Sequence, residues 1–442
     1  MNISVIGLGK LGLCTATCFA SKGHKVIGVD INTEVLNRLR AHQCPINETG
    51  LEELLGKSWD NLFFTDDFGY AVLNSDITLI IVPTPSNPGG DDHSSGRFNT
   101  ERVEKVLKAL SPAISEKHSF HIVDVVSTVM PGSSDKVFKP LLEKLTGKSC
   151  GKEFGLVYNP EFIALGSVIK NFLAPDLVLI GSSDKKSASL VETLYLSMCD
   201  NKPYIATMSL INAEIAKLTL NCYVTMKISF ANDLSKICEQ VPGADIDVIT
   251  SAIGADTRIG RKYLRGGLGF GGPCFPRDNL AFQSFAKDAD IDAKLSIKVV
   301  EINNEVVDRL FKKVCEHTKS GKVAILGLSY KPDTHIVEES QPIILAKKLV
   351  FQGYCVAVHD PKAIDEAKTV LGNLVEYYTD PYECVKYADA IILMTDWQMY
   401  RELDWQRIDN SIKNGTLLID SWRILKDKEN DKIKYFSIGV CK

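Results

Sequence analysis

Residues 3–30 read ISVIGLGKLGLCTATCFASKGHKVIGVD, and this stretch decides the fold of the first part of the chain. A short apolar run, 3–6, leads into a glycine-rich turn, 7–12, and a helical pattern that extends to Ser21. A second apolar run, 25–29, then ends in Asp30. Strand, glycine turn, helix, strand and acid in this order predict the opening βαβ unit of a doubly wound parallel sheet.

The glycines of this turn and the acid after the second strand predict a dinucleotide site. Gly7 permits the tight turn, Gly9 lets the backbone approach a pyrophosphate, and Gly12 lets the helix pack closely on the strand. The free N–H groups at the helix start would bind the phosphates. Asp30 can accept hydrogen bonds from a ribose 2′-hydroxyl and would repel a 2′-phosphate, so NAD is favoured over NADP. The residues expected to bind NAD here are Gly7, Leu8, Gly9, Lys10, Leu11, Gly12 and Asp30.

A related pattern returns late in the chain. The apolar strand 322–328 is followed by a polar turn and a helical stretch, 342–350, and Gly353 to Asp360 repeats the seven-residue step from Gly23 to Asp30. This half has no GxGxxG, so we expect a second α/β domain that binds something other than a dinucleotide pyrophosphate.

Residues 209–240 lie between the two patterns, contain no proline and have helical spacing of apolar residues. They predict one helix of on the order of 45 Å, which suits a domain connector or a dimer interface. The predicted fold is therefore α/β, with two Rossmann-like doubly wound domains joined by a long central helix. We expect an NAD-binding domain at 1–203, a central helical dimerisation region at 204–300 and a second ligand-binding domain at 301–442.

Composition excludes several classes of protein. The chain has 442 residues, 45% of them hydrophobic and 24% charged, with a net charge of −4 and no basic block, which is typical of a multidomain globular protein and argues against a nucleic acid polymer as partner. No apolar run approaches the ~20 residues of a membrane span, and the chain starts directly in a strand without a secretory leader. Its twelve cysteines show neither CxxC pairs nor metal-ligand spacing, which indicates a cytoplasmic protein without a structural metal.

The densest unusual segment, 268–278, surrounds Cys274 with glycines. Such a loop can turn backbone N–H groups toward a substrate or a developing oxyanion, and Cys274 could be a nucleophile; the alternative is a glycine turn with an inert cysteine. Lys217 and Asn221 are four residues apart on the expected long helix, hence on one face. A lysine in such a stripe is otherwise a surface residue.

Two further segments follow strand ends, where open α/β sheets bind ligands. Ser127 and Thr128 follow the strand 122–126, and a hydroxyl there could instead cap the next helix. Glu161 and Phe162 follow a proline turn, which by itself would mark a helix start.

Together these segments resemble the UDP-glucose/GDP-mannose dehydrogenase family, from the first strand to about residue 425. The motifs that carry the resemblance follow in chain order: GxGxxG at 7–12, PIxExGL at 45–51, VPTP at 82–85, STVxPG at 127–132, NPEF at 159–162, AExxKxxxN at 213–221, KISF at 227–230, RIG at 258–260, the Cys274 segment, GLSYKP at 327–332 and TDW at 395–397.

The resemblance implies a four-electron oxidation of a nucleotide sugar from C6 alcohol to carboxylate, with NAD as cofactor. Cys274 would form a thiohemiacetal and then a thioester, while Lys217 and Asn221 would stabilise the C6 oxyanion. Asp278 would move protons, Glu161 would be a general base and Thr128 would help to hold a water. The resemblance also implies cofactor contacts from Pro83, Thr84, Ser127, Thr128 and Arg277. Substrate contacts would come from Glu161, Phe162, Lys217, Asn221, Arg258, Tyr263, Leu264, Phe270, Gly271 and Lys331, with Arg258 reaching the substrate of a neighbouring subunit.

Within the family, the Cys274 segment and NPEF are similar to the UDP-glucose and GDP-mannose members rather than those acting on UDP-N-acetylhexosamines, and residues 227–230 favour UDP-glucose. Leu165 stands where the family has a second glutamate, and Glu338 where it has an arginine. These departures keep open a non-catalytic NAD-binding sensor or subunit. We further expect a homodimer or a higher homo-oligomer, because the long helix suits an interface.

Overall fold

The computed structural model describes residues 1–442 except 88–95, 164–165, 426–429 and 442. The chain divides into two compact units, Met1–Thr219 and Leu220–Lys442, each described here by itself. One continuous helix, α9 (Leu210–Cys238), crosses the division. It confirms the long central helix expected at 209–240.

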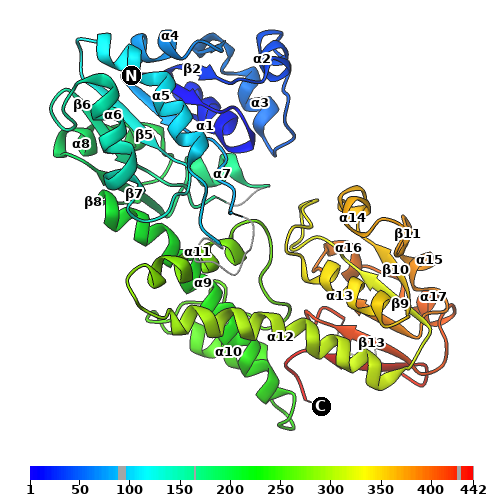
Figure 1. Ribbon diagram of the computed structural model, residues 1–442. Helices are drawn as coiled ribbons and strands as arrows, with labels where there is room; N and C mark the ends of the chain where they lie inside the picture. The colour runs from blue at the N-terminus through cyan, green and yellow to red at the C-terminus, as the bar shows by residue number, and fades with distance from the viewer. Residues whose placement is uncertain (88–95, 164–165, 426–429, 442) are drawn as a thin grey trace. The chain divides into compact units, whose positions relative to one another are not determined.

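The N-terminal unit is built on one eight-stranded sheet of order β3-β2-β1-β4-β5-β6-β7-β8 (Figure 1). The strands from β1 to β6 pair in parallel, and β7 pairs antiparallel with β6. The strand order reverses between β1 and β4, and doubly wound sheets bind ligands at the carboxyl ends of such strands. The strands are β1 (Asn2–Ile6), β2 (Lys25–Val29), β3 (Leu62–Thr65), β4 (Ile77–Ile80), β5 (His121–Val125), β6 (Phe154–Tyr158), β7 (Leu177–Ser182) and β8 (Tyr204–Ser209).

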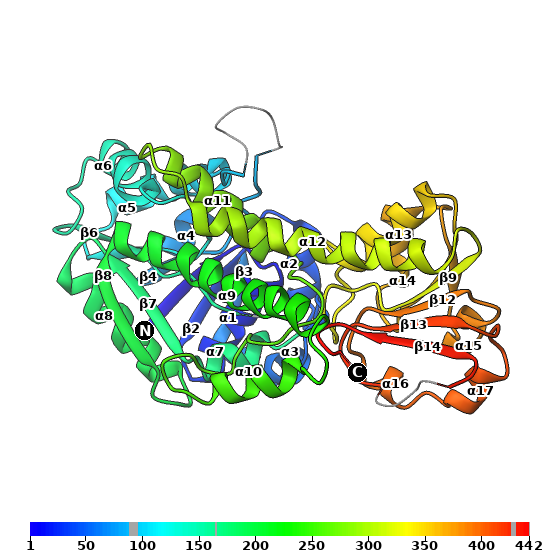
Figure 2. The same ribbon diagram turned by 90° about the horizontal axis from the view of Figure 1, so that it is seen from below.

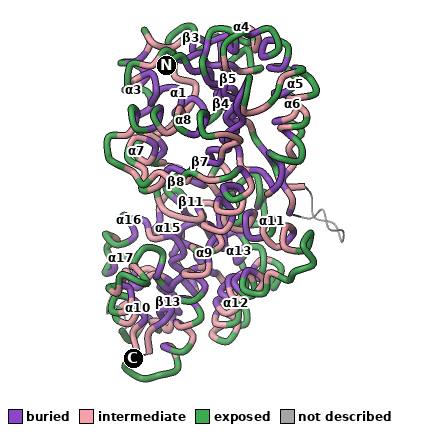
Figure 3. Tube along the Cα trace, turned by 90° about the vertical axis from the view of Figure 1, so that its left-hand side faces the viewer, coloured by how far each residue is buried: buried purple, intermediate pink, exposed green. Residues whose placement is uncertain are grey.

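Two apolar cores cover the two faces of this sheet. Helices α1, α3, α7 and α8 contribute to the first core, and α4, α5 and α6 to the second. Strands β1, β4, β5 and β6 lie between them and are buried on both faces, as the purple trace at β4 and β5 in Figure 3 shows. Their sequences are therefore mostly apolar, with Asp124 on β5 as an exception. The helices are α1 (Lys10–Ser21), α2 (Thr33–Arg40), α3 (Leu51–Gly56), α4 (Phe68–Leu73), α5 (Glu101–Glu116), α6 (Lys139–Thr146), α7 (Val168–Leu173) and α8 (Lys185–Met198), with short η1 (Trp59–Asn61) and η2 (Ser134–Phe138).

The C-terminal unit carries a second, six-stranded sheet, all parallel, of order β11-β10-β9-β12-β13-β14 (Figure 2). When its strands are numbered from the first one in the chain, this sheet has the same strand order as β1 to β6 of the N-terminal unit. The second doubly wound domain is therefore confirmed. The strands are β9 (Lys322–Leu326), β10 (Cys355–His359), β11 (Glu376–Tyr378), β12 (Ala390–Leu393), β13 (Thr416–Asp420) and β14 (Ile433–Ser437).

Helices also cover both faces of the second sheet. Helices α12, α13 and α14 pack on one face and α15, α16 and α17 on the other. Helix α11 packs along α12 before the sheet begins. The helices of this unit are α10 (Ile246–Gly254), α11 (Phe275–Lys287), α12 (Lys294–His317), α13 (Gln341–Phe351), α14 (Ile364–Leu371), α15 (Pro381–Val385), α16 (Gln398–Arg401) and α17 (Trp405–Asp409). In the part of the chain that the structure describes, no helix is both long and apolar enough to cross a bilayer.

Candidate active site

The turn between β1 and α1 has the geometry that a dinucleotide needs. Gly7 has a φ of +95°, and a Cβ on Gly12 would lie 1.8 Å from the Gly7 carbonyl oxygen, so neither position accepts a side chain without movement. A Cβ on Gly9 would meet no atom within 4 Å, which leaves the backbone at the start of α1 open to a ligand. Leu8 is buried, whereas Lys10 is exposed and Leu11 half-buried.

Asp30 directly follows β2, beside this turn, and is only half-buried. Its Oδ2 accepts from the Leu8 N–H at 2.7 Å and its Oδ1 from the Asn32 N–H at 2.8 Å. A carboxylate has about four lone-pair sites, so acceptor capacity remains for a ribose hydroxyl. The residues at this turn therefore fit an NAD molecule.

The corresponding acid of the C-terminal unit is used differently. Asp360 is 3% exposed, and its carboxylate accepts six hydrogen bonds, from the backbone N–H groups of Leu328, Ser329, Lys362 and Ala363, the Ser329 hydroxyl and the Trp397 indole. Its acceptor sites are occupied within the protein, so Asp360 cannot accept a hydrogen bond from a ribose hydroxyl as Asp30 can. The sequence repeat therefore marks a repeated fold, in which the acid after the second strand binds protein groups in the C-terminal unit.

The loops after β4 and β5 are tied together by hydroxyl groups. The Thr84 hydroxyl donates to the Thr128 carbonyl at 2.7 Å. The Ser127 hydroxyl donates to the Val82 carbonyl at 2.7 Å and accepts from the Val82 N–H at 2.9 Å. The predicted cofactor residues of these loops, with Pro83, therefore lie at the carboxyl ends of adjacent strands, next to β1. Ser127 is engaged by this cross-link.

The loop after β6 brings Glu161, Phe162 and Lys217 together. The Lys217 ammonium donates to the Glu161 carbonyl oxygen at 2.6 Å and lies 4.5 Å from the centre of the Phe162 ring. The Glu161 carboxylate accepts from the Tyr195 hydroxyl at 2.9 Å. Burial raises the pKa of Glu161 to about 7, against the Tyr195 hydrogen bond and the Lys217 charge, which lower it. A carboxylate with this pKa can take up a proton near neutral pH.

The C-terminal unit brings Cys274, Asp278 and Asn221 together. Cys274 is exposed at the N-cap of α11, and its carbonyl accepts the Asp278 N–H at 2.8 Å, so the two residues are one helical turn apart. Asp278 is 1% exposed; its Oδ2 accepts from the Asn221 amide at 2.6 Å, and its Oδ1 has no hydrogen-bond partner in the described residues. The Arg277 Nε lies 3.7 Å from Oδ1. A helix start next to a buried carboxylate supplies both stabilisation of negative charge at sulfur and a proton acceptor.

For three N–H groups of the glycine loop before Cys274, the prediction that they face a ligand is wrong. The N–H groups of Gly269, Phe270 and Gly272 donate to the side chains of Gln341 and Asn303 and to the Glu338 carbonyl, at 2.7, 2.6 and 3.0 Å. These groups are satisfied by the protein and do not point at a ligand. The glycines serve close packing instead, because a Cβ on Gly272 would lie 2.6 Å from the ring of Tyr330.

Two of the remaining predicted substrate residues lie beside Cys274, because the rings of Tyr263 and Phe270 are edge-on to the ring of Phe275, with centroids 6.1 and 6.3 Å away. Phe270 and Leu264 are buried, as is Gly271, whereas Tyr263 is 52% exposed, with a φ of +64°. Arg258 is exposed and pairs with Asp256 at 2.6 Å.

The structure also describes the C-terminal lysine and one of the two positions that depart from the family pattern. Lys331 lies 5.7 Å from the ring of Tyr330. Glu338, at a position of departure, is exposed, and Leu165 lies outside the described residues.

The predicted residues therefore gather in two clusters, one in each unit. The first contains the β1–α1 turn, Thr128, Glu161 and Lys217, and the second contains Asn221, Cys274 and Asp278. Lys217 and Asn221 are four residues apart on the single helix α9, which carries one member of each cluster on the same face. That both clusters act on one substrate remains a prediction.

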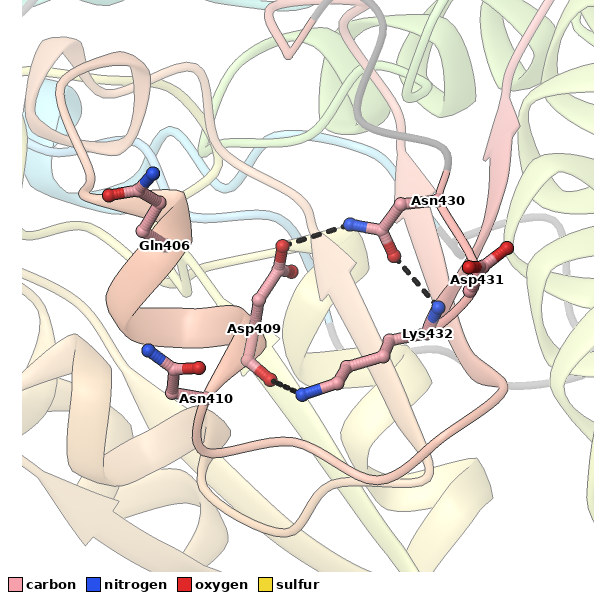
Figure 4. Close-up of a pocket in the computed structure, with 6 residues that line it drawn as sticks. All are labelled: Gln406, Asp409, Asn410, Asn430, Asp431 and Lys432. Carbon is pink, nitrogen blue, oxygen red and sulfur yellow. Dashed lines mark hydrogen bonds between the residues drawn. The ribbon is translucent and has the colours of Figure 1, made fainter.

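A polar pocket of about 560 Å³ lies elsewhere, and none of the predicted site residues lines it (Figure 4). Its lining includes Asp409, which accepts from the Asn430 amide and, at its carbonyl, from the Lys432 ammonium, each at 2.9 Å. Three of its six lining residues therefore bind one another. In the part of the chain described, no group of three or more His, Cys, Asp or Glu side chains is placed to hold a metal ion.

Three buried polar residues near the first cluster were missed from the sequence. Tyr195 reads as an ordinary apolar position of α8. Asp124 interrupts the apolar strand β5, and this charge in a buried run was the signal available. Glu214 is fully buried on α9 and accepts the N–H groups of Gly132 and Ser134 at 2.6 and 2.8 Å, which anchors the loop that follows Thr128.

Comparison with known proteins assigns the family. The domain models of the UDP-glucose/GDP-mannose dehydrogenase family match residues 1–199 (NAD binding domain), 211–305 (central domain) and 324–427 (UDP binding domain). The UDP-glucose 6-dehydrogenase TuaD of Bacillus subtilis is 35% identical over 99% of this chain and 93% of its own length. The UDP-glucose 6-dehydrogenase AglM of Haloferax volcanii is 31% identical over 97% of this chain and 98% of its own.

Solved structures agree with this assignment. A UDP-glucose dehydrogenase of Pyrobaculum islandicum has a TM-score of 0.88 and 33% identity, and the match covers 100% of this chain and 98% of that one. A UDP-D-ManNAc dehydrogenase of Pyrococcus horikoshii has a TM-score of 0.82 and 26% identity, with 99% of each chain covered. The chain described here therefore belongs to the UDP-glucose/GDP-mannose dehydrogenase family and is an NAD-dependent oxidoreductase.

Proposed function

We propose that this protein is a UDP-glucose 6-dehydrogenase, which converts R–CH₂OH, water and two NAD⁺ into R–COO⁻, two NADH and three protons. The observation that carries the proposal is the exposed Cys274 thiol at the start of α11, one turn from the buried Asp278–Asn221 pair. A dehydrogenase that stopped at the aldehyde would need no such thiol. The names of the full-length relatives support UDP-glucose as the sugar nucleotide.

NAD supplies the hydride acceptor for both oxidations. The N–H groups at the start of α1, where a Cβ on Gly9 would meet no atom within 4 Å, would hold its pyrophosphate, and Asp30 would accept a hydrogen bond from a ribose hydroxyl. Pro83, Thr84, Ser127, Thr128 and Arg277 are the further contacts proposed for the cofactor.

The thiol is needed because an aldehyde has no alcohol C–H to release as hydride. In the first oxidation, C6 loses a hydride and its hydroxyl proton passes to solvent water, as one of the three protons released overall. Cys274 then forms a C–S bond to the aldehyde carbon, and Asp278 accepts the thiol proton. Lys217 and Asn221 donate hydrogen bonds to the oxygen that becomes negative. The resulting thiohemiacetal still carries one hydrogen on C6, which leaves as the second hydride and gives a thioester.

Hydrolysis of the thioester uses the loops of the N-terminal unit. Glu161 takes a proton from the attacking water, which Thr128 helps to hold, and the C–S bond breaks to return the Cys274 thiolate. The pKa of about 7 at Glu161 suits this role, since the group is ionised at mildly alkaline pH and still basic enough to accept a proton.

The substrate is proposed to contact residues of both units. Phe162 would line the sugar pocket, and Tyr263, Leu264, Phe270, Gly271 and Lys331 would contact the nucleotide sugar in the C-terminal half. The domain limits proposed from the sequence, 1–203, 204–300 and 301–442, assign the NAD, the central helical region and the nucleotide to successive parts of the chain.

We propose that two copies associate through the central helix. On α9, Tyr223, Phe230 and Ile237 recur every seven residues, and each is more than half exposed, at 56, 53 and 58%. Three large apolar side chains on one stripe are typical of a helix that packs on another subunit. Arg258 would then reach the neighbouring substrate. Phe230→Lys is expected to give monomers in analytical ultracentrifugation, and a dimer in that variant would contradict this interface.

The twelve cysteines are all free in the structure, which supports a reducing cytoplasmic location.

The catalytic proposal is tested by an NADH assay with UDP-glucose, GDP-mannose, UDP-GlcNAc and UDP-GalNAc. Two NADH per UDP-glucose, with UDP-glucuronate as product, support it. One NADH per sugar would indicate a single-step dehydrogenase, and no NADH with any of the four would indicate a non-catalytic NAD-binding protein.

A further inference from the structure

A buried tyrosine holds one carboxylate oxygen of Glu161. The Tyr195 hydroxyl on α8 donates to Oε1 at 2.9 Å, and its ring is 2% exposed. Phe19 and Phe172 pack against that ring, with centroids 5.9 and 6.0 Å away. The aromatic core therefore fixes the hydroxyl, and the hydroxyl fixes Oε1. Among the described residues, Oε2 of Glu161 has no hydrogen-bond donor.

A second carboxyl group lies behind Glu161 in the same core. Asp124 stands on β5, in register with Leu79 on β4 and Val157 on β6, and is 0% exposed. Neither of its oxygens has a hydrogen-bond partner in the described residues. Burial and the negative charge of Glu161 raise the pKa of Asp124 well above its usual value. A carboxyl group in such surroundings stays neutral, so Glu161 is the group of this pair that ionises first.

The other titratable groups near Glu161 come from three further elements of the N-terminal unit. Lys217 on α9 is the cation, and its charge lowers the pKa of Glu161. Cys18 on α1 and Cys199 just after α8 are thiols whose pKa burial raises, that of Cys199 to about 11. The pKa of Tyr195 is raised by burial and by both carboxyl groups. At neutral pH the thiols and the phenol are therefore uncharged, and the hydrogen bond from Tyr195 stabilises the charged form of Glu161.

We propose that Tyr195 is a positioning residue for the general base: it fixes Oε1 of Glu161, so that Oε2 is left to take the proton from the hydrolytic water. This inference rests on the proposed role of Glu161 in thioester hydrolysis. In this role Tyr195 acts only through the orientation and ionisation of the carboxylate to which it donates.

The test is the pH dependence of UDP-glucuronate release by Tyr195→Phe, which removes one oxygen and keeps the ring packing. A general base must be ionised, so its pKa sets the acid limb of the profile. Because the lost hydrogen bond stabilised the carboxylate, the pKa of Glu161 rises and the acid limb moves to higher pH, by about one pH unit. The rate on the alkaline plateau falls less than tenfold, and the KM for UDP-glucose is unchanged.

Glu161→Asp gives a second route to the same result, because the shorter side chain withdraws its oxygen from the phenol and the acid limb again moves to higher pH. Asp124→Asn replaces a neutral carboxyl with a neutral amide, so its acid limb stays at the wild-type pH. The matched control is Tyr354→Phe in the C-terminal unit. That tyrosine is 5% exposed and donates to the Thr318 carbonyl at 2.6 Å, and its loss leaves the profile unchanged.

The outcomes separate this inference from the proposed function. If Glu161→Gln releases UDP-glucuronate at the wild-type rate, Glu161 is not the base and the proposed hydrolysis step fails. If Glu161→Gln is slow while Tyr195→Phe keeps the wild-type acid limb, the base stands and the positioning role of Tyr195 is wrong. An acid limb that moves to lower pH in Asp124→Asn would show that Asp124 carries charge, and would overturn the order of ionisation.

Discussion

The Gly9→Ala substitution separates folding from cofactor binding. The φ and ψ of Gly9, −71° and −169°, suit alanine, and its Cβ would meet no atom within 4 Å. The fold therefore gains about 0.4–1 kcal/mol from the smaller conformational freedom of the unfolded chain. NAD loses affinity, because the methyl group occupies the space through which the pyrophosphate approaches the backbone. If this overpacking costs about 1–3 kcal/mol, the Kd of NAD rises roughly 5- to 150-fold.

Thermal unfolding with and without NAD measures both effects, with calorimetric titration for the Kd. At NAD equal to 100 times the wild-type Kd, binding stabilises the folded protein by about 2.7 kcal/mol. A variant with a 100-fold weaker Kd retains only about 0.4 kcal/mol of this at the same concentration. Gly12→Ala is the control, because its Cβ would lie 1.8 Å from the Gly7 carbonyl oxygen and must disturb the fold itself. Wild-type NAD affinity in Gly9→Ala would refute the assignment of the pyrophosphate to this turn.

Three further predictions concern other parts of the chain. Cys274→Ala abolishes UDP-glucuronate formation while the melting temperature stays within about 2 °C, since the residue is exposed; product analysis and calorimetry check this. Gly272→Ala destabilises the C-terminal unit by about 1–3 kcal/mol in urea unfolding, because its φ is +80° and its Cβ would press on Tyr330. Burial and the Lys117 charge lower the pKa of His121 to about 3. The free energy of unfolding therefore falls by up to about 1.4 kcal/mol per pH unit below pH 6.5. In His121→Gln, urea unfolding at pH 7 and pH 5 shows a smaller loss of stability than in the wild type.

The sign of the His121 effect follows from linkage. The unfolded state binds a proton at its ordinary pKa, whereas the folded state does not until about pH 3, so acid favours unfolding throughout this window. An equal loss of stability between pH 7 and 5 in the wild type and the variant would contradict a neutral, buried His121.

The winding of both domains could be predicted because it depends on local patterns. Apolar runs of four to seven residues bounded by glycine and acids specify buried parallel strands, and 342–350 predicted α13, which the structure places at Gln341–Phe351. The seven-residue step from glycine to acid likewise revealed that β2 and β10 hold equivalent places in the two domains. It could not reveal that Asp360 accepts six hydrogen bonds from the protein while Asp30 does not. The Trp397 indole and the turn at 328–329, which supply several of the donors, lie 31 to 37 residues away in the sequence.

The glycine loop before Cys274 is a second case in which residues distant in sequence decide the hydrogen bonds. Its sequence predicts N–H groups free for a ligand, but the acceptors that satisfy them come from Asn303, Glu338 and Gln341, on segments that only the fold brings to the loop. The pKa of Glu161 is a comparable case, because Tyr195, 34 residues away, and burial in the core decide it.

The sequence by itself determined which residue types are available and on which element each stands: a glycine turn, a thiol beside a helix start, and a lysine and an asparagine on one helical face. These are short-range properties, set by backbone geometry and spacing. The tertiary structure decided which N–H groups are satisfied, which carboxyl is neutral and which oxygen of Glu161 is held. Hydrogen bonding and desolvation depend on neighbours distant in the chain, so only packing fixes them.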